Sequence, residues 1–349
     1  MRIAQVCPRY SPDIGGVETH VEEISKRLVR KGHDVTVLTT DPSGRLPKSE
    51  TIDDVKVIRF HSFAPGDAYF LSPSLYSYIK RSGDFDIVHA HGYHAFPAYF
   101  ATYTRSPRLI FTPHYHGHGH TPLRNLLLKP YAMLGKRIFS RADSVICVSE
   151  FEKSLVCRDF MCDEKAVVIP NGVNKAEFKS VEPYPKGMKV VLYVGRLEEY
   201  KGVQYAIRAL PYLHWHRLLV IGKGPYKDAL VKEAAAARVK DKVGFMAGMS
   251  RDELLRWYAT ADVFVMLSRF EAFGITVAEA LTAGVPCIVA NGSALSEFAG
   301  DSCKAVELPI SGEELAADIE AAVFAGTPPG VLDWDDVVER VLKVYGEQG

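Results

Sequence analysis

Strand-like and helix-like segments alternate along this chain, and the alternation runs through it twice. Short runs rich in Val, Ile, Leu and Phe are separated by segments with apolar residues at helical spacing. This order predicts parallel sheets, because a connection between parallel strands has to cross the sheet, usually as a helix. The first series of strand-like runs covers residues 2–8, 34–40, 55–60, 86–91, 108–114, 144–149 and 166–172. The second covers residues 189–196, 217–222, 242–247, 263–267, 285–290 and 303–308.

The repetition and the length together predict two domains. A chain of 349 residues is longer than the roughly 250–300 residues at which single cores usually stop growing. The stretch 181–187, which contains two prolines and a glycine, interrupts the alternation and predicts a linker. We therefore expect an α/β protein with two Rossmann-like, doubly wound domains, at residues 1–180 and 181–330, and an amphipathic helix within residues 331–349.

Two carboxylates eight residues apart mark one strand–loop–helix–strand segment, at residues 263–290. Glu271 lies in the predicted loop, and Glu279 lies one turn into the predicted helix. Open α/β sheets bind ligands at such places, where free N–H groups of a helix start meet the carboxyl end of a strand. The intervening glycine, Gly274, would let the backbone approach a ligand closely. The alternative is that Glu271 caps the helix and Glu279 is a solvated charge.

Three other predicted strand-to-helix loops carry glycines or cations. The pair Gly15-Gly16 opens the first helix, Arg196 and Lys201 follow the first strand of the second series, and Gly222 follows the next strand. Glycines at helix starts suit phosphate or sugar binding, and fixed cations stabilise a departing phosphate group. Each feature also has an ordinary interpretation, as turn glycines or as solvated surface charges.

Histidines are concentrated in two clusters, at residues 89–94 and 114–120. Imidazoles are common zinc ligands, so the clusters are compatible with a metal site. However, no acidic residue occurs between Asp86 and Asp143, the four histidines of the second cluster alternate along Gly-rich backbone, and no Cys-x-x-Cys pair is present. We predict no metal site. Because the same segment contains seven Lys and Arg residues, it should have a positive surface.

Taken in order, the Gly15-Gly16 loop, the GRL-x3-KG motif at residues 195–202 and the E-x7-E pair make the chain resemble the retaining, family 4 glycosyltransferases. The resemblance covers nearly the whole chain. It implies the GT-B fold, in which two Rossmann-like domains face a cleft and the C-terminal helix packs back on the first domain. It further implies transfer of a hexosyl unit from a nucleotide diphosphate sugar to a hydroxyl of a glycan, lipid or small molecule, with no metal cofactor.

The resemblance also implies roles for individual residues, and its Thr-x-His motif, here 112–114, supplies a histidine beside the sugar. The catalytic residues would be His114, Arg196, Lys201 and Glu271. The donor-binding residues would be Gly15, Gly16, Gly222, Gly224, Phe273, Gly274, Ile275 and Glu279. The acceptor side would include Glu18, His116, His118, Glu150 and Asn171, with His116 and His118 as rivals of His114.

Two other function classes remain open at this point. A sugar-nucleotide epimerase of the same fold would convert the donor without an acceptor. A non-catalytic module that binds a nucleotide sugar or a lipid would bind without turnover. A nicotinamide oxidoreductase is disfavoured, since no G-x-G-x-x-G follows any predicted strand.

The expected location is cytoplasmic. No apolar run approaches the ~20 residues of a membrane span, and the first residues lack the layout of a signal peptide. The stretch 123–141 combines apolar residues with five Lys and Arg residues. Such a segment either lies on an anionic membrane surface, as in a peripheral protein at the inner face, or buries its apolar face in the domain core. No nucleic-acid partner is expected.

Overall fold

The chain folds into two compact units. The computed structural model describes residues 1–117, 133–325 and 330–346. Unit 1 comprises Met1–Asn171 together with Trp334–Gly349, and unit 2 comprises Gly172–Asp333. The sequence placed the first boundary later, after residue 180, and the second earlier, after residue 330. In the structure, unit 2 begins with β9 (Gly172–Val173) and ends with β16 (Leu332–Asp333). These two short strands pair in parallel with each other.

Unit 1 is built on an eight-stranded sheet in the order β3-β4-β2-β1-β5-β6-β7-β8. All neighbouring strands are parallel except β3 and β4. The strands are β1 (Arg2–Val6), β2 (Asp34–Asp41), β3 (Ser49–Ile52), β4 (Val55–His61), β5 (Ile87–His91), β6 (Arg108–Thr112), β7 (Ser144–Cys147) and β8 (Ala166–Val168). The helices with bounds inside the described residues are α1 (Gly16–Arg30), α2 (Pro73–Arg81), α3 (Phe96–Ala101), α5 (Glu150–Phe160) and α11 (Trp334–Tyr345).

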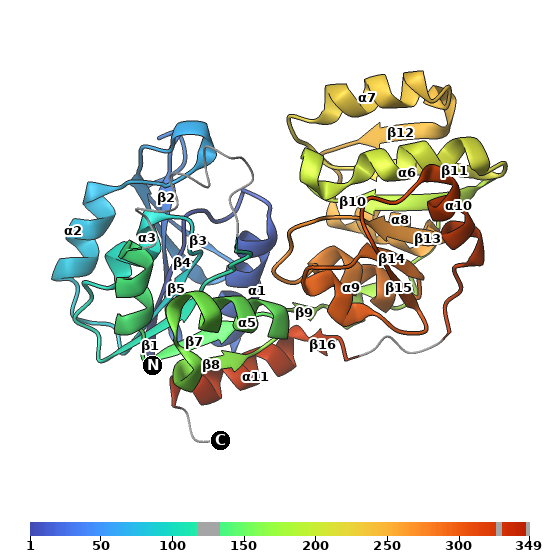
Figure 1. Ribbon diagram of the computed structural model, residues 1–349. Coiled ribbons are helices and arrows are strands. Elements are labelled where there is room, and N and C mark those ends of the chain that lie inside the picture. Colours follow the sequence, from blue (N-terminus) through green and yellow to red (C-terminus); the bar gives the residue numbers. More distant parts are fainter. Residues whose placement is uncertain (118–132, 326–329, 347–349) are drawn as a thin grey trace. The chain divides into compact units, whose positions relative to one another are not determined.

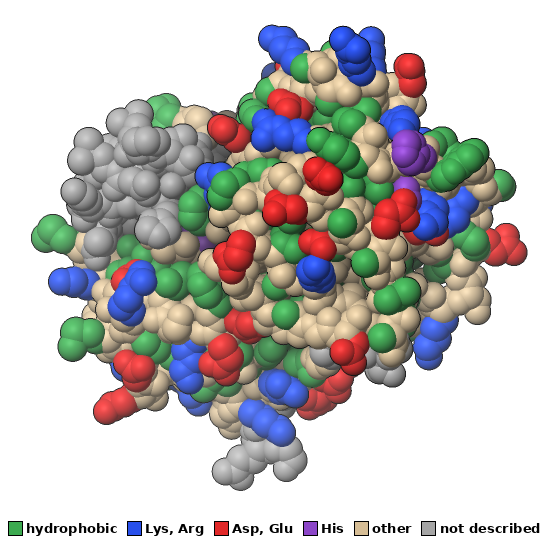
Figure 2. Space-filling model, turned by 45° about the vertical axis from the view of Figure 1, so that its right-hand side comes forward, with side chains coloured by type: hydrophobic (Ala, Val, Ile, Leu, Met, Phe, Trp, Pro, Cys, Tyr) green, Lys and Arg blue, Asp and Glu red, His purple; other side chains and the backbone are tan. Residues whose placement is uncertain are grey.

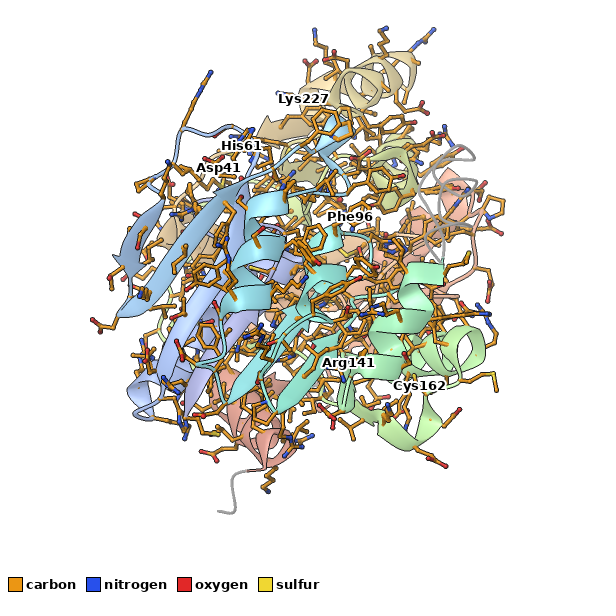
Figure 3. The ribbon with its side chains drawn as sticks, turned by 90° about the vertical axis from the view of Figure 1, so that its left-hand side faces the viewer. Asp41, His61, Phe96, Arg141, Cys162 and Lys227 are labelled. Atoms are coloured by element: carbon orange, nitrogen blue, oxygen red, sulfur yellow. The ribbon has the colours of Figure 1, made fainter. Side chains whose placement is uncertain are left out.

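The parallel strands of unit 1 bring their carboxyl ends to one edge of the sheet. Asp41 ends β2, and His61 ends β4 directly beside it. In Figure 3 these two residues lie toward the upper end of the sheet, whereas Arg141 and Cys162, which precede β7 and β8, lie toward the lower end. Because β1 is hydrogen-bonded to both β2 and β5, the strand order reverses between β1 and β5. This reversal is the switch point at which doubly wound sheets bind ligands.

Unit 2 repeats this plan with a six-stranded sheet in the order β12-β11-β10-β13-β14-β15, with all neighbours parallel. The strands are β10 (Lys189–Val194), β11 (His216–Ile221), β12 (Val243–Met246), β13 (Val263–Met266), β14 (Cys287–Ala290) and β15 (Cys303–Val306). The helices are α6 (Val203–Ala209), α7 (Lys227–Ala236), α8 (Arg251–Thr260), α9 (Ile275–Thr282) and α10 (Gly312–Ala321). Here the order reverses between β10 and β13.

Helix α11 belongs to unit 1, although the chain reaches it only after passing through unit 2 (Figure 1). Its apolar side is buried at Trp334, Val337, Val338, Val341, Leu342 and Tyr345. The helix packs on α1, where Arg27 binds Asp335 at 2.7 Å and Lys31 binds Glu339. Most of the attachment energy should come from the buried apolar residues, because exposed ion pairs contribute little.

The predicted α/β fold with two doubly wound parallel sheets is confirmed. The sequence missed β3, a short antiparallel strand at the sheet edge whose Ser-Glu-Thr-Ile sequence has no apolar run. It also missed the two-residue strands β9 and β16, which are shorter than any periodic pattern. Within the described residues, no helix combines the length and the apolar character that a membrane span requires.

A buried carboxyl group joins the loop after β6 to α5. Glu152 is fully buried and accepts hydrogen bonds from the backbone N–H of Tyr115 at 2.5 Å and of Val148 at 2.6 Å. Burial raises the pKa of Glu152 to about 8, although the two N–H groups oppose the shift. Since Tyr115 follows His114, Glu152 fixes the position of the histidine loop.

The packing of α11 predicts how much stability is lost when one of its buried side chains is shortened. Leu342→Ala should lower the free energy of unfolding of unit 1 by about 2–5 kcal/mol, because a buried leucine is replaced by a space that the core fills incompletely. Urea unfolding monitored by circular dichroism measures this change. Arg340→Ala, on the exposed side of the same helix, is the matched control and should leave stability within about 0.5 kcal/mol. Equal stability of both variants would show that α11 is not an integral part of unit 1.

Glu152 predicts a dependence of stability on pH. Its pKa is about 8 in the fold, against 4.5 for an unperturbed carboxyl group, so the folded state holds the proton more tightly. This contribution is present below pH 4.5 and is lost as the pH rises to about 8, at a slope on the order of 1 kcal/mol per pH unit. Urea unfolding between pH 5 and 8 should therefore show a smaller decline in Glu152→Gln than in the wild type. Glu164→Gln, an exposed substitution, should retain the wild-type slope, and the prediction fails if all three slopes agree.

Candidate active site

In unit 2, the loops after β10 and β11 pack against each other through their backbones. Leu197 N–H donates to the carbonyl of Lys223 at 2.9 Å. A Cβ on Gly222 would lie 1.9 Å from the carbonyl oxygen of Gly195, and a Cβ on Gly224 would lie 2.2 Å from that of Leu197. Both predicted donor-binding glycines, Gly222 and Gly224, are thus required by loop packing, whether or not a ligand also contacts them.

Two of the predicted site residues, Lys201 and Glu271, form an ion pair at the switch point of unit 2. Lys201 follows β10, Glu271 follows β13, and their Nζ and Oε1 atoms are 2.5 Å apart. Only 13% and 16% of these side chains are exposed. Burial disfavours the ammonium group, but Glu271 and Tyr200 outweigh burial and raise the pKa of Lys201. Lys201 is therefore held as a fixed positive charge.

The other predicted cation, Arg196, is far more exposed than Lys201. The side chain of Arg196 is 63% exposed, and its guanidinium contacts Glu198 at 3.1 Å. The hydroxyl of Tyr193 donates to the carbonyl of Arg196 at 2.8 Å and so fixes the backbone rather than the side chain. An exposed pair of this kind contributes about 0–1 kcal/mol, so the guanidinium can turn toward an incoming anion at little cost.

Glu279, the second carboxylate of the E-x7-E pair, has different partners from the first. It is 8% exposed, binds Arg251 at 2.6 Å and accepts from the hydroxyl of Tyr258 at 2.8 Å. Burial works against the charge on Arg251, but Glu279 and Glu177 outweigh it and raise the pKa of Arg251. The carboxylate is thus oriented from two sides. Sequence reasoning missed Arg251 and Tyr258, which lie on α8.

The start of α9 has the backbone geometry expected from its glycine. Gly274 is the N-cap with φ +110°, and no side chain caps the helix. Ile275 is the first helical residue, and the ring of Phe273 meets that of Phe298 edge to face at 5.2 Å. The phenylalanine anchors the loop on the unit 2 core, next to a helix start of the kind that binds oxygen-rich ligands.

In unit 1, the predicted Gly15-Gly16 pair opens α1, with Gly15 as the N-cap. The carboxylate of Glu18 folds against Gly15, where an added Cβ would lie 2.4 Å from its Oε2 atom. Gly16, by contrast, has open space beside it. A carboxylate at this point favours a hydroxyl-bearing ligand over a phosphate, unless Glu18 moves away.

His114 and His116 belong to different groups of neighbouring histidine rings in unit 1. His114 lies 4.9 Å from His20 and 6.2 Å from His91, between ring centroids. His116 instead stacks on His94 at 4.9 Å. The backbone of His114 has φ +48°, a conformation that is uncommon outside glycine and often marks functional positions. The predicted residue His118 lies outside the described residues.

The two remaining acceptor-side candidates differ in exposure. Glu150 is exposed as the first residue of α5. Asn171 is buried, and its Oδ1 atom is 2.6 Å from Nδ1 of His20. Sequence reasoning missed His20. The helical spacing of Val17, His20, Val21 and Ile24 places it on the buried side of α1, so a polar residue on an otherwise apolar side was the available signal.

Comparison with known proteins identifies the family. Glycosyltransferase Family 4 matches residues 14–177, and Glycosyl transferases group 1 matches residues 174–323. The chain is 31% identical over 326 residues to an uncharacterized glycosyltransferase of Methanocaldococcus jannaschii, covering 85% of this chain and 82% of that protein. It is 28% identical over 377 residues to the GDP-mannose:cellobiosyl-diphosphopolyprenol alpha-mannosyltransferase of Xanthomonas oryzae pv. oryzae, covering 99% and 96%.

Solved structures agree on the fold. The structure of Anabaena HepE in complex with UDP-glucose superposes with a TM-score of 0.79 at 17% identity, covering 99% of this chain and 100% of that one. Both halves of the sequence and both folded units therefore lead to one conclusion: the chain is a glycosyltransferase of the group 1, family 4 type, with the GT-B fold.

Proposed function

We propose that this glycosyltransferase is a retaining enzyme that moves a hexosyl unit from a nucleotide diphosphate sugar to an acceptor hydroxyl. The observation that carries the proposal is the ion pair between Lys201 and Glu271 at the switch point of unit 2. A poorly solvated, fixed cation stabilises the negative charge that develops on a departing diphosphate. Arg196, which is exposed and weakly paired, would supply the second positive charge.

Glu279 would bind the ribose of the nucleotide. A carboxylate has about four sites for accepting hydrogen bonds, and Arg251 and Tyr258 use one on each oxygen. One site per oxygen is left, which suits two neighbouring ribose hydroxyls. The backbone of Phe273, Gly274 and Ile275 would contact the sugar and phosphates, with Gly222 and Gly224 beside the nucleotide.

In the proposed reaction, the bond between the anomeric carbon and the diphosphate oxygen breaks, and the acceptor oxygen forms a new bond on the same face. The proton of the acceptor hydroxyl passes to the departing diphosphate. Glu271 would orient the sugar hydroxyls, and His114 would lie beside the sugar. Arg196 and Lys201 replace the cation that a metal-dependent enzyme would use, so we expect no metal cofactor for transfer.

The acceptor is proposed to be a glycan, a lipid or a small molecule bound by unit 1, with Glu18, His116, Glu150 and Asn171 as candidate contacts. The name of the Xanthomonas relative specifies a lipid-diphosphate-linked glycan, which supports an acceptor of that class. Unit 2, which the sequence predicted as residues 181–330, would bind the donor. Unit 1, which the sequence predicted as residues 1–180 with the helix in 331–349, would bind the acceptor.

Peripheral binding to an anionic membrane was predicted from the basic stretch 123–141, and only part of this stretch is described. Residues 123–132 of the basic stretch lie outside the described residues. In the described part, Ile138 and Phe139 are buried in the unit 1 core, while Lys136 is exposed. Figure 2 shows acidic and basic side chains interspersed on the face in view. Membrane contact would therefore depend on the basic side chains rather than on these apolar residues.

Lys201 provides the direct test of transition-state stabilisation. Lys201→Ala should lower kcat about a hundredfold or more, because removing one preorganised charge-stabilising group costs roughly 3–4 kcal/mol. Release of nucleotide diphosphate from the donor measures the rate, and the anomeric configuration of the product, read by NMR, tests retention. Lys227→Ala, an exposed lysine in the same unit, is the matched control. Wild-type rates in folded Lys201→Ala protein would overturn the proposed role, and an inverted product would overturn retention.

Glu279 provides the test of nucleotide binding. In thermal unfolding with UDP, GDP, ADP and dTDP and their sugars, we expect stabilisation by one nucleotide family, worth about 2.7 kcal/mol at 100 times the Kd. Glu279→Gln should largely abolish this shift, since a neutral amide is a poorer partner for two ribose hydroxyls and loses the charge held by Arg251. Glu313→Gln, exposed on α10, should bind normally. An undiminished shift in Glu279→Gln would place the ribose elsewhere.

A further inference from the structure

Three histidines from different parts of unit 1 converge at its switch point. His20 comes from α1, which follows β1, His91 ends β5, and His114 follows β6. One nitrogen of each ring lies within 4.8 Å of the corresponding nitrogens of the other two. Since β1 and β5 are the strands between which the sheet order reverses, the cluster occupies the position where this type of sheet binds ligands.

The inward nitrogens of the cluster lack hydrogen-bond partners. Within residues 1–117, 133–325 and 330–346, no protein group is hydrogen-bonded to Nε2 of His20, Nδ1 of His91 or Nε2 of His114. His20 is 1% exposed and His91 is 0% exposed. A buried polar atom left without a partner costs about 1–3 kcal/mol. Three such atoms in one cluster can share a single ligand.

The ring nitrogens that face away from the cluster form hydrogen bonds, and these bonds determine which nitrogen of His20 and of His91 carries the proton. Nδ1 of His20 is 2.6 Å from Oδ1 of Asn171, and Nε2 of His91 is 2.7 Å from Oε1 of Gln5. The Gln5 amide is oriented in turn by its donation to the hydroxyl of Tyr345 at 3.1 Å. An amide oxygen only accepts, so both outward nitrogens carry protons and both inward nitrogens present lone pairs. Metal-binding histidines are oriented by outer hydrogen bonds in the same manner.

The rings are also in the charge state that coordination requires. Burial lowers the pKa of His20 to about 4 and holds the pKa values of His91 and His114 well below the ordinary value of 6.5. All three imidazoles are therefore neutral near pH 7. At His20 and His91, a cation can bind without first displacing a proton from the inward nitrogen.

We propose that His20, His91 and His114 form a binding site for a divalent transition-metal ion of the Zn²⁺ class. Three neutral imidazoles with a fourth position left to a small ligand are a known zinc arrangement. The described residues add no carboxylate to this cluster, so the oxygen-seeking ions Ca²⁺ and Mg²⁺ are unsuited to it. The site goes beyond the proposed transferase function, for which we expect no metal cofactor.

Ring separations fit the proposed coordination with a small adjustment. Zinc–nitrogen bonds of about 2.0–2.1 Å in tetrahedral geometry place ring centroids about 5 Å apart. His20 lies 5.3 Å from His91 and 4.9 Å from His114, whereas His91 and His114 are 6.2 Å apart. The donor nitrogens, which lie within 4.8 Å of one another, would also have to approach to about 3.3 Å to share one ion. Because His114 lies outside helix and strand, it is the residue best placed to make this shift.

The site has a functional consequence that rests on the proposed role of His114. A metal ion bound to Nε2 of His114 would withdraw that nitrogen from the sugar, so Zn²⁺ should inhibit transfer rather than support it. Metal binding itself does not depend on that role. The two statements are therefore tested by separate measurements.

Binding is tested with the full chain, freed of metal by EDTA and titrated with Zn²⁺ by calorimetry and with Co²⁺ by its visible absorption. We expect one ion per chain. His20→Phe and His91→Phe keep an aromatic ring but remove its nitrogens, and should weaken binding about a hundredfold or more. Gln5→Leu, which removes an outer hydrogen bond, should weaken it about 10–100-fold. His61→Ala, an exposed histidine at the same edge of the sheet, is the matched control and should bind as the wild type does.

The possible results distinguish metal binding from the catalytic role of His114. Absence of binding by the wild type, or equal binding by all four folded variants, would overturn the metal site. Tetrahedral Co²⁺ bands lost only in the cluster and outer-bond variants would establish it. If Zn²⁺ binds as expected but leaves the transfer rate unchanged, the metal site stands and the catalytic assignment of His114 is wrong.

Discussion

Parallel pairing of the strands determines where chemistry can occur in this protein. In a parallel sheet every strand ends at the same edge, so the loops that follow the strands are neighbours in space even when they are distant in sequence. Each unit has one reversal of strand order, between β1 and β5 and between β10 and β13. The histidine cluster and the pair of Lys201 and Glu271 lie at these two places. The remaining structure supports and orients these loops.

Backbone packing makes several residues of the site necessary for reasons unrelated to a ligand. Gly222 has φ +154° and lies directly against the backbone of Gly195, and Gly202 has φ +76° beside the carbonyl of Leu267. Larger residues at Gly202 and Gly222 would push apart loops that carry Arg196 and Lys201. Such glycines therefore keep charged side chains in register whether or not a ligand also contacts them.

The sequence was sufficient to predict the fold and to name candidate site residues, but not to predict the partners of those residues. Alternating strands and helices predicted both sheets, and motif resemblance singled out Lys201 and Glu271. That these two side chains touch depends on β10 lying beside β13, which is a property of strand order. Arg251 could not be anticipated for the same reason, because nothing in its local sequence points to Glu279. His20 was overlooked since a single histidine in an amphipathic helix is usually a structural residue.

The two units present different kinds of polar group to a ligand. Unit 2 presents permanent charges, because Glu271 keeps Lys201 protonated and Arg251 orients Glu279. Unit 1 presents neutral lone pairs, because burial keeps His20, His91 and His114 unprotonated. Fixed charges compensate the charge of a nucleotide diphosphate, whereas neutral nitrogens suit hydroxyl groups or a transition metal. Burial has different effects in the two units because Lys201 and Glu279 each have an oppositely charged partner, whereas no carboxylate joins the cluster of His20, His91 and His114 within the described residues.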